Sequence, residues 1–120
     1  MATNKKIILG GDFNCVEDLL LDKSQNNEDK GQVSRAILKD IADKANITDV
    51  YRRLNPNGKE TTCFNAAKNL YSRIDRIYID ATLISQVAKV EHSNVTFSDH
   101  NSVTFILKNI KKPRKGVLEV

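Results

Sequence analysis

Three short polar islands, each lying at the end of an apolar run, limit most strongly what this chain can fold into. They read Gly10-Gly11-Asp12-Phe13-Asn14, Ser72-Arg73-Ile74-Asp75-Arg76-Ile77 and Ser98-Asp99-His100-Asn101-Ser102. Short runs of β-branched and aromatic residues that stop at polar or glycine positions are typical of strands that reach loops. The islands therefore predict a strand-rich chain whose carboxylate, amide and imidazole groups gather at strand ends.

The rest of the pattern predicts an α+β fold, a mixed β-sheet with one flanking helix. Apolar residues recur at helical spacing over residues 34–45, with Ser34 as the expected N-cap and Asn46 as the stop. Strands are predicted at residues 6–11, 61–66, 72–79, 87–95 and 102–107. The first run is continuously apolar, which favours a strand covered on both faces.

Size and charge indicate one globular domain with a basic end. The chain has 120 residues, of which 40% are hydrophobic and 28% charged, with a formal net charge of +4. We expect residues 1–110 to form the domain and residues 111–120 a basic tail or linker. The positive balance fits nucleic acid or an ordinary basic protein about equally.

Cysteine usage and hydropathy bear on the compartment. Cys15 and Cys63 have neither metal-site nor disulfide-framework spacing, which favours a reducing, intracellular setting, nuclear or cytoplasmic. No apolar run approaches the length of a membrane span, so no membrane partner is expected.

The first island can supply metal-assisted phosphodiester chemistry. On an extended backbone Asp12 and Asn14 would face the same side, while Phe13 points into the core. A carboxylate can activate water or hold a hard cation, and a carboxamide can contact a phosphate oxygen without adding negative charge. The alternative is a loop in which Asp12 and Asn14 make only local turn bonds.

The other two islands add an acid and an imidazole. Asp75 lies inside an apolar run and needs a partner, either a neighbouring arginine, Arg73 or Arg76, or the His100 ring. Asp99 could hold a metal or its waters, and His100 could donate to a phosphoryl oxygen, although a plain surface loop would read the same way. His92 lacks such a context and is expected at the surface.

The three islands, in this order, resemble those of the endonuclease/exonuclease/phosphatase (DNase I-like) superfamily. The wording Gly-Gly-Asp-Phe-Asn, Ser-Arg-Ile-Asp-Arg-Ile and Phe97-Ser98-Asp99-His100 looks most like the endonuclease domain of LINE-type (non-LTR) retrotransposons. The resemblance covers nearly the whole chain but only the C-terminal half of that family's domain. It implies half of a DNase I-like α/β sandwich.

The resemblance also implies roles for individual residues. Asp12 would orient or deprotonate the attacking water, and Asn14 would contact the phosphate or that water. Asp75 would hold the ring of His100, which would contact the scissile phosphate. The implied cofactor is Mg²⁺ or Mn²⁺, bound by Asp99 and Asp12. Supporting contacts to the substrate would come from Ser72 and Arg73.

In that family the principal metal-binding Glu lies in the N-terminal half, and nothing in this sequence replaces it; Glu17 matches no family ligand. The implied function is metal-dependent DNA nicking. The partners expected are DNA and either an N-terminal half-domain, a reverse transcriptase domain or a second copy. Two alternatives stay open, namely a non-catalytic remnant that binds nucleic acid or protein, and a phosphatase of the same superfamily.

Overall fold

The computed structural model describes residues 5–25, 31–95 and 98–108. The expected basic tail at 111–120 and the Phe97 position of the third island lie outside these described residues. Within the described ranges, no helix is long and apolar enough to cross a membrane.

A three-stranded antiparallel sheet brings the first two polar islands together. Its order is β1 (Ile8–Asp12), β5 (Asp75–Asp80) and β2 (Ile47–Asp49). The register pairs Ile8 with Ile79 at one end and Asp12 with Asp75 at the other. Because antiparallel partners lie directly across the ladder, the first carboxylates of the two islands become neighbours.

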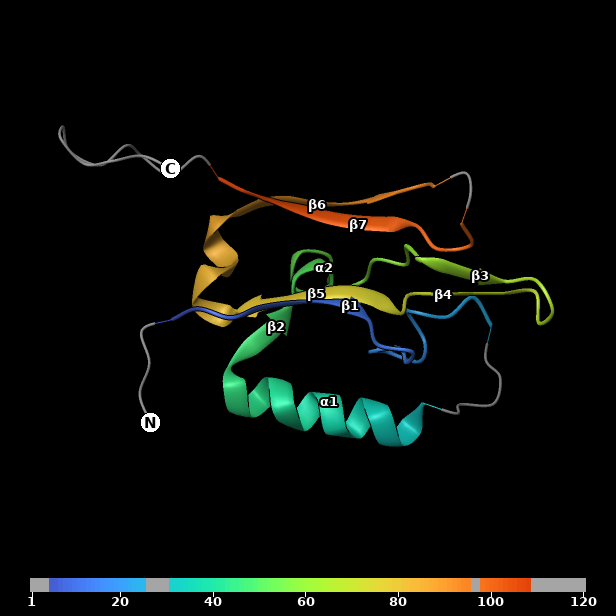
Figure 1. Ribbon diagram of the computed structural model, residues 1–120, viewed down its shortest axis with the longest axis horizontal. Helices are drawn as coiled ribbons and strands as arrows, with labels where there is room; N and C mark the ends of the chain where they lie inside the picture. Colours follow the sequence, from blue (N-terminus) through green and yellow to red (C-terminus); the bar gives the residue numbers. More distant parts are fainter. Residues whose placement is uncertain (1–4, 26–30, 96–97, 109–120) are drawn as a thin grey trace, which may run out of the picture.

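Two hairpins and two α-helices surround this sheet (Figure 1). The hairpins are β3 (Cys63–Asn65) with β4 (Leu70–Ser72), and β6 (Val87–Ser93) with β7 (Ser102–Leu107). The β6–β7 hairpin follows a 3₁₀ helix, η1 (Ala81–Gln86), and lies on the opposite side of the sheet from α1 (Gln32–Ala45). The short α2 (Val50–Leu54) sits between the sheet and β6.

The hydrophobic core lies between the sheet and the β6–β7 hairpin. Its buried centre is Val50, Ile79 and Val87, one residue each from α2, β5 and β6. Half-buried apolar side chains pack around it from β5, η1, β6 and β7: Ile77, Leu83, Ile84, Val90 and Phe105. Alternation along β5 explains the arrangement, since Ile77 and Ile79 share one face and Tyr78 points to the other.

The helix α1 confirms the predicted element and its end but not its beginning. Asn46 adopts the left-handed conformation expected of a C-cap, with φ 56° and ψ 46°. The N-cap is Gly31 and not Ser34, and Gly31 has no side chain to cap the helix. A Cβ at position 31 would lie 2.8 Å from the Cβ of Cys15, so the close approach to Cys15 favours glycine at this position.

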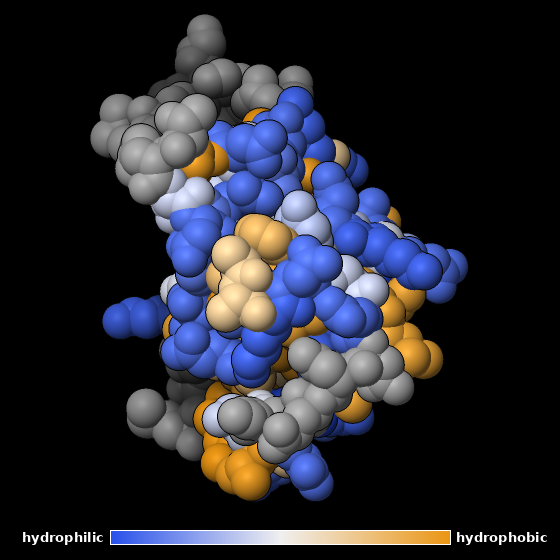
Figure 2. Space-filling view, turned by 90° about the vertical axis from the view of Figure 1, so that its right-hand side faces the viewer, coloured by the Kyte–Doolittle hydropathy of each residue, from blue (hydrophilic) through white to orange (hydrophobic). Residues whose placement is uncertain are grey.

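The apolar face of α1 is only partly covered. Val33, Ile37 and Ile41 remain 72%, 55% and 48% exposed. In Figure 2 hydrophobic side chains gather at the lower edge of the molecule, at the level where Figure 1 places α1. The described part of the chain therefore leaves an apolar surface along this helix.

The strand prediction holds for β7, which spans the predicted residues 102–107, and β3 and β6 lie within the predicted runs 61–66 and 87–95. Two other strand predictions need correction. The run 72–79 is broken, because β4 ends at Ser72 and β5 begins at Asp75. The first strand is not covered on both faces: all five residues of β1 are exposed, Ile8 by 55%. It is an outer strand of the described sheet, so one of its edges has no neighbour among the described residues.

A buried ion cluster fills the break between β4 and β5. The Arg73 guanidinium is fully buried and donates to both carboxylate oxygens of Asp22, at 2.8 and 3.2 Å. It also donates to both carboxylate oxygens of Asp49, at 3.1 and 2.6 Å. Asp22 also accepts from Arg52 and from the backbone N–H groups of Glu17 and Asp18.

This cluster is well enough connected to hold its charges. Burial alone would raise the pKa of the Asp22 carboxyl, but the hydrogen bonds and charge of Arg73 bring that pKa below its usual value. A buried ion pair is tolerated when each partner's remaining hydrogen-bonding sites are filled, as they are at Asp22. The cluster joins three segments, the loop after β1, the β4–β5 break and the start of α2.

His92 is inside the protein and not at the surface as predicted. Its side chain is 4% exposed, and its ring lies 4.8 Å from the ring of Tyr51, at the junction of α2 and β6. Neither ring nitrogen has a hydrogen-bond partner among the described residues, and Nδ1 lies 3.6 Å from the Glu60 carboxylate. A lone histidine in a polar sequence context gave no sign of this stacking.

Removing the cation of the buried cluster should destabilise the protein strongly. We expect Arg73→Leu to lower the free energy of unfolding by about 3–5 kcal/mol, because it removes the cation that two buried carboxylates share and leaves Asp49, among the described residues, with only the Arg52 backbone N–H. The matched control is Lys44→Leu, which breaks the exposed Lys44–Asp40 pair and should change stability by less than about 1 kcal/mol. Urea unfolding measures both, and equal losses in the two variants would contradict the assignment.

The buried His92 ring should make stability depend on pH below neutrality. Burial lowers the pKa of His92, opposed by Glu60, so the unfolded chain takes up the proton at higher pH than the folded chain. The stabilisation is complete above about pH 6.5 and is lost as pH falls through the folded pKa. We expect His92→Phe, which keeps a ring on Tyr51, to flatten the pH dependence of the unfolding free energy below about pH 6.5. An unchanged slope in His92→Phe would show that other groups cause it.

Candidate active site

Asp12 lies at the end of β1, in a turn that depends on glycine. Gly11 has φ +152°, a conformation that side-chain-bearing residues rarely adopt, and no atom lies within 4 Å of where its Cβ would be. The Asp12 carboxylate accepts the backbone N–H of Asn14 at 2.8 Å. Asn14 is left-handed, with φ 56°, so the extended backbone expected for this pair is wrong.

The hydrogen bond of this local turn engages only one of the two carboxylate oxygens of Asp12. Only Oδ1 takes the Asn14 N–H, while Oδ2 lies 4.0 Å from Nε2 of His100. The side chain is 38% exposed and so remains accessible to solvent. The turn bond that the sequence offered as an alternative to function is thus present, and it leaves one carboxylate oxygen facing the His100 ring.

The second and third islands meet in a short hydrogen bond. Nδ1 of His100 lies 2.7 Å from Oδ2 of Asp75, so His100, and neither arginine, is the partner of Asp75. This bond, with the charge of Asp75, raises the pKa of His100 above its ordinary value. The other nitrogen, Nε2, lies 4.0 Å from carboxylate oxygens of both Asp12 and Asp99.

Backbone contacts hold the third island against the β3–β4 hairpin. The N–H of Phe64 donates to the carbonyl of Asp99 at 3.1 Å, and Cys63 forms a β-bridge with His100. The Ser98 hydroxyl accepts the N–H of His100 at 3.0 Å. The loop between β6 and β7 is therefore placed by a different part of the chain from the one that places Asp12.

The donor set fits a hard divalent cation. One ligand atom each of Asp12, Asp75 and His100 lies within 4.8 Å of the others. Asp75 is engaged by His100, whereas the side chains of Asp12 and Asp99 are 38% and 73% exposed. Mg²⁺ and Mn²⁺ take carboxylate oxygens and keep several waters, which one or two such carboxylates can support.

A groove of about 320 Å³ adjoins this centre. It runs over β1, β5 and β7 and is lined by Gly10, Gly11, Asp75, Arg76, Ile77, Asn101 and Val103. A Cβ at Gly10 would lie 3.5 Å from Ile77, in ordinary van der Waals contact, so a side chain there would occupy part of the groove. The small residues of the first island thus leave space next to Asp75.

Of the two residues expected to contact substrate, Arg73 lies elsewhere. The Arg73 guanidinium is enclosed by Asp22 and Asp49, so it has no exposed donor to offer a phosphate. Ser72 is half-buried, and its carbonyl accepts the N–H of Thr62 at 2.8 Å. Arg73 is therefore part of the buried ion cluster and not of the candidate site.

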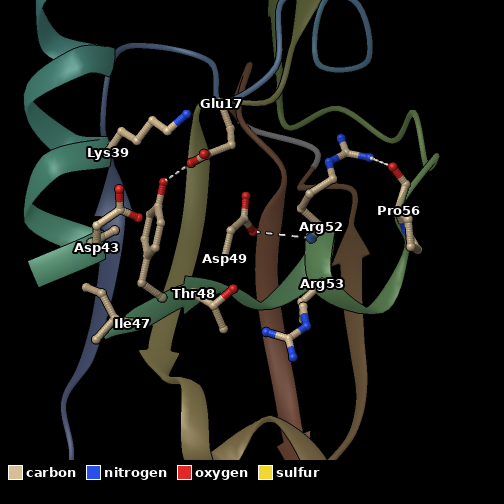
Figure 3. Close-up of a pocket in the computed structure, with 11 residues that line it drawn as sticks. Glu17, Lys39, Asp43, Ile47, Thr48, Asp49, Arg52, Arg53 and Pro56 are labelled. Carbon is tan, nitrogen blue, oxygen red and sulfur yellow. Dashed lines mark hydrogen bonds between the residues drawn. The ribbon is translucent and has the colours of Figure 1, made fainter. Parts of the chain in front are cut away.

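A second pocket, of about 480 Å³, lies between α1, β2 and α2 (Figure 3). Glu17 reaches into it and accepts the hydroxyl hydrogen of Tyr78. Arg52 donates to the Pro56 carbonyl at its other end, at 3.3 Å. Glu17 therefore has a partner outside the Asp12–Asp75–His100 centre, in agreement with its lack of a family counterpart.

Sequence reasoning missed two residues that support the centre. Thr62 is fully buried and contacts the backbone of both Asp75 and the third island. Asp22 anchors the turn after β1. Thr62 lies near the start of the predicted strand 61–66 and Asp22 in a predicted loop, and neither position carries a local signal that it would be buried.

The comparisons with known proteins show which family the chain belongs to. Residues 2–100 match the model of the endonuclease/exonuclease/phosphatase family. A relative from Xenopus laevis, described as a transposon TX1 uncharacterized 149 kDa protein, is 33% identical over 107 residues, which is 85% of this chain and 8% of that protein.

Solved nuclease structures share the fold. They include the AP endonuclease LMAP from Leishmania major (TM-score 0.71, 19% identity), the 3'-5' exonuclease NExo from Neisseria meningitidis (0.71, 23%) and the catalytic domain of Xenopus laevis APE2 (0.72, 23%). The likeness covers 85–86% of this chain but only 35%, 45% and 36% of those chains. The family model spans all three polar islands up to His100, and the chain belongs to the endonuclease/exonuclease/phosphatase family.

Proposed function

We propose that this chain carries the Asp12–Asp75–His100 part of a metal-dependent endonuclease that nicks DNA. The observation that carries the proposal is the line of three groups in which Asp75 holds Nδ1 of His100 and Nε2 faces Asp12. The similarity to a transposon protein and to DNA-processing nucleases supports DNA as the substrate.

In this mechanism His100 acts on the phosphate. Asp75 fixes the ring and favours its protonated form, so Nε2–H can donate to a phosphate oxygen as negative charge builds. Positioned donors of this kind typically contribute about 10²- to 10³-fold in rate. The raised pKa keeps this donor charged at a pH where an ordinary histidine has lost its proton.

Asp12 is assigned to the attacking water. Its outward oxygen is exposed and lies on the same side as Nε2 of His100, so a water beside Asp12 would also be near a phosphate held by His100. Asn14, turned at the end of the island, is assigned to the phosphate or that water. A bound Mg²⁺ or Mn²⁺, held by Asp12 and Asp99, would neutralise charge on the phosphodiester.

We propose further that the centre is completed by the rest of a DNase I-like domain. The nuclease structures that share the fold are more than twice as long as the matched part of this chain. Ile7 and the first two residues of β1, Ile8 and Leu9, are 43%, 55% and 40% exposed, and this apolar sheet edge has no neighbouring strand among the described residues. Proteins normally cover an edge of this kind. The other half of the domain is therefore the first partner to test, ahead of a second copy of this chain.

Two other functions remain as outcomes of the same experiment. A non-catalytic binding remnant is favoured by the short span of the match, and it would bind DNA in a salt-sensitive way without cleaving it. A phosphatase is favoured by a further structure with the same fold, that of the 3' phosphatase NExo from Neisseria bound to a product DNA hairpin. It would release phosphate from a DNA end without nicking.

The deciding experiment is nicking of supercoiled plasmid in Mg²⁺ and Mn²⁺. The chain is assayed alone and co-produced with the stretch that precedes the matched region in the transposon relative. We expect nicking by the completed protein, abolished by EDTA. Asp12→Asn and His100→Gln should each reduce the rate about 10²- to 10⁴-fold.

The control for these variants is Asp43→Asn on α1, an exposed acid outside the centre, which should leave the rate unchanged. Cleavage that persists in Asp12→Asn and His100→Gln would contradict the assignment. DNA binding without metal-dependent cleavage would support the remnant, and phosphate release alone the phosphatase.

A further inference from the structure

The hydroxyl of Thr62 fills a gap in the backbone hydrogen bonding beside the candidate site. Thr62 is fully buried, and its Oγ1 accepts the N–H groups of both Ile74 and Asp75, each at 3.1 Å. These two N–H groups lie at the break between β4 and β5, where the Arg73 side chain points into the ion cluster. The Thr62 hydroxyl oxygen therefore accepts backbone N–H groups that a carbonyl of a neighbouring strand accepts elsewhere in the sheet.

The backbone of Thr62 is bonded on both sides. Its N–H donates to the Ser72 carbonyl at 2.8 Å, and its carbonyl accepts the N–H of Asn101 at 2.6 Å. The Asn101 side chain in turn donates to the carbonyl of Thr61 at 3.1 Å. Thr62 thus contacts the residue that follows His100 as well as Asp75 itself.

The consequence for the site is geometric. Asp75 and His100 come from segments 25 residues apart, and their 2.7 Å bond requires the two segments to stay in fixed relation. Thr62 is bonded directly to one segment through its hydroxyl and to the other through its carbonyl. The carbonyl of Ile74 also accepts the N–H of Phe13 at 2.9 Å, so a shift at this break would move the Asp12 turn too.

We propose that Thr62 is a positioning residue, whose hydroxyl sets the Asp75 carboxylate against the His100 ring. Its effect on cleavage rests on the proposed nuclease function, but its effect on the Asp75–His100 bond does not. A threonine whose methyl group only filled space would be replaced without loss by valine, which has the same shape. A threonine that acts through its oxygen would be replaced by serine and not by valine.

The test reads the hydrogen bond directly in the chain as it exists. Nitrogen-15 NMR of the His100 ring reports whether Nδ1 carries a bonded proton, in the absence of metal and DNA. We expect that signal in the native protein and in Thr62→Ser, and its loss in Thr62→Val. The matched control is Thr82→Val, which removes an exposed hydroxyl bonded to Asp80, at the opposite end of β5 from Asp75.

A Thr62→Val protein that is folded and keeps the Nδ1–H signal would overturn the proposal. If Thr62→Val does not fold, the test is amide hydrogen exchange in the native protein and in Thr62→Ser. We expect the amides of Ile74 and Asp75 to be protected in both proteins. Rapid exchange at either amide would overturn the proposal. In the completed nuclease we expect Thr62→Val to lower kcat at least tenfold with little change in KM. If no cleavage is found in the native protein either, the proposed function fails while the NMR result still stands for Thr62.

Discussion

The arrangement of the described chain depends on one buried cation, Arg73, held between Asp22 and Asp49. A guanidinium cannot be left unpaired inside a protein, so the chain must bring two acids from distant segments to it. Because Arg73 is turned into the protein, the predicted strand 72–79 is interrupted between β4 and β5. Asp22, one of its two acids, also accepts a backbone N–H of the loop after β1 and so holds that loop in place. The interruption also makes Asp75 the first residue of β5, directly across the ladder from Asp12.

The candidate site is built on this frame from three separate supports. Gly11 turns β1 so that Asp12 ends at the sheet edge, Thr62 holds the backbone at Asp75, and the β3–β4 hairpin holds Asp99 and His100. The resulting carboxylates differ in their environments: Asp75 is engaged by the ring, whereas Asp12 and Asp99 face solvent. Asp75 can therefore orient the His100 ring, while Asp12 and Asp99 remain available to bind a cation or water.

Much of this could be predicted from sequence, and the failures have physical causes. Alternation identified β7, and the polar islands identified Asp12, Asp75 and His100, because strand ends and isolated acids leave local signals. Arg73 was misplaced because an arginine close to an acid in the sequence looks the same whether its side chain faces a phosphate or a buried carboxylate. His92 and the bare face of β1 were misjudged because each depends on long-range packing, which no local pattern encodes.

The central claim is that the three islands form one centre that holds a divalent cation. Paramagnetic broadening by Mn²⁺ of the NMR signals of the chain tests this claim most directly. The account predicts that low Mn²⁺ broadens Asp12, Asp99 and His100 first and leaves Asp40 and Asp43 on α1 sharp, although those helix acids are also exposed. Broadening of the α1 acids to the same extent, or no selective broadening at the three islands, would contradict it.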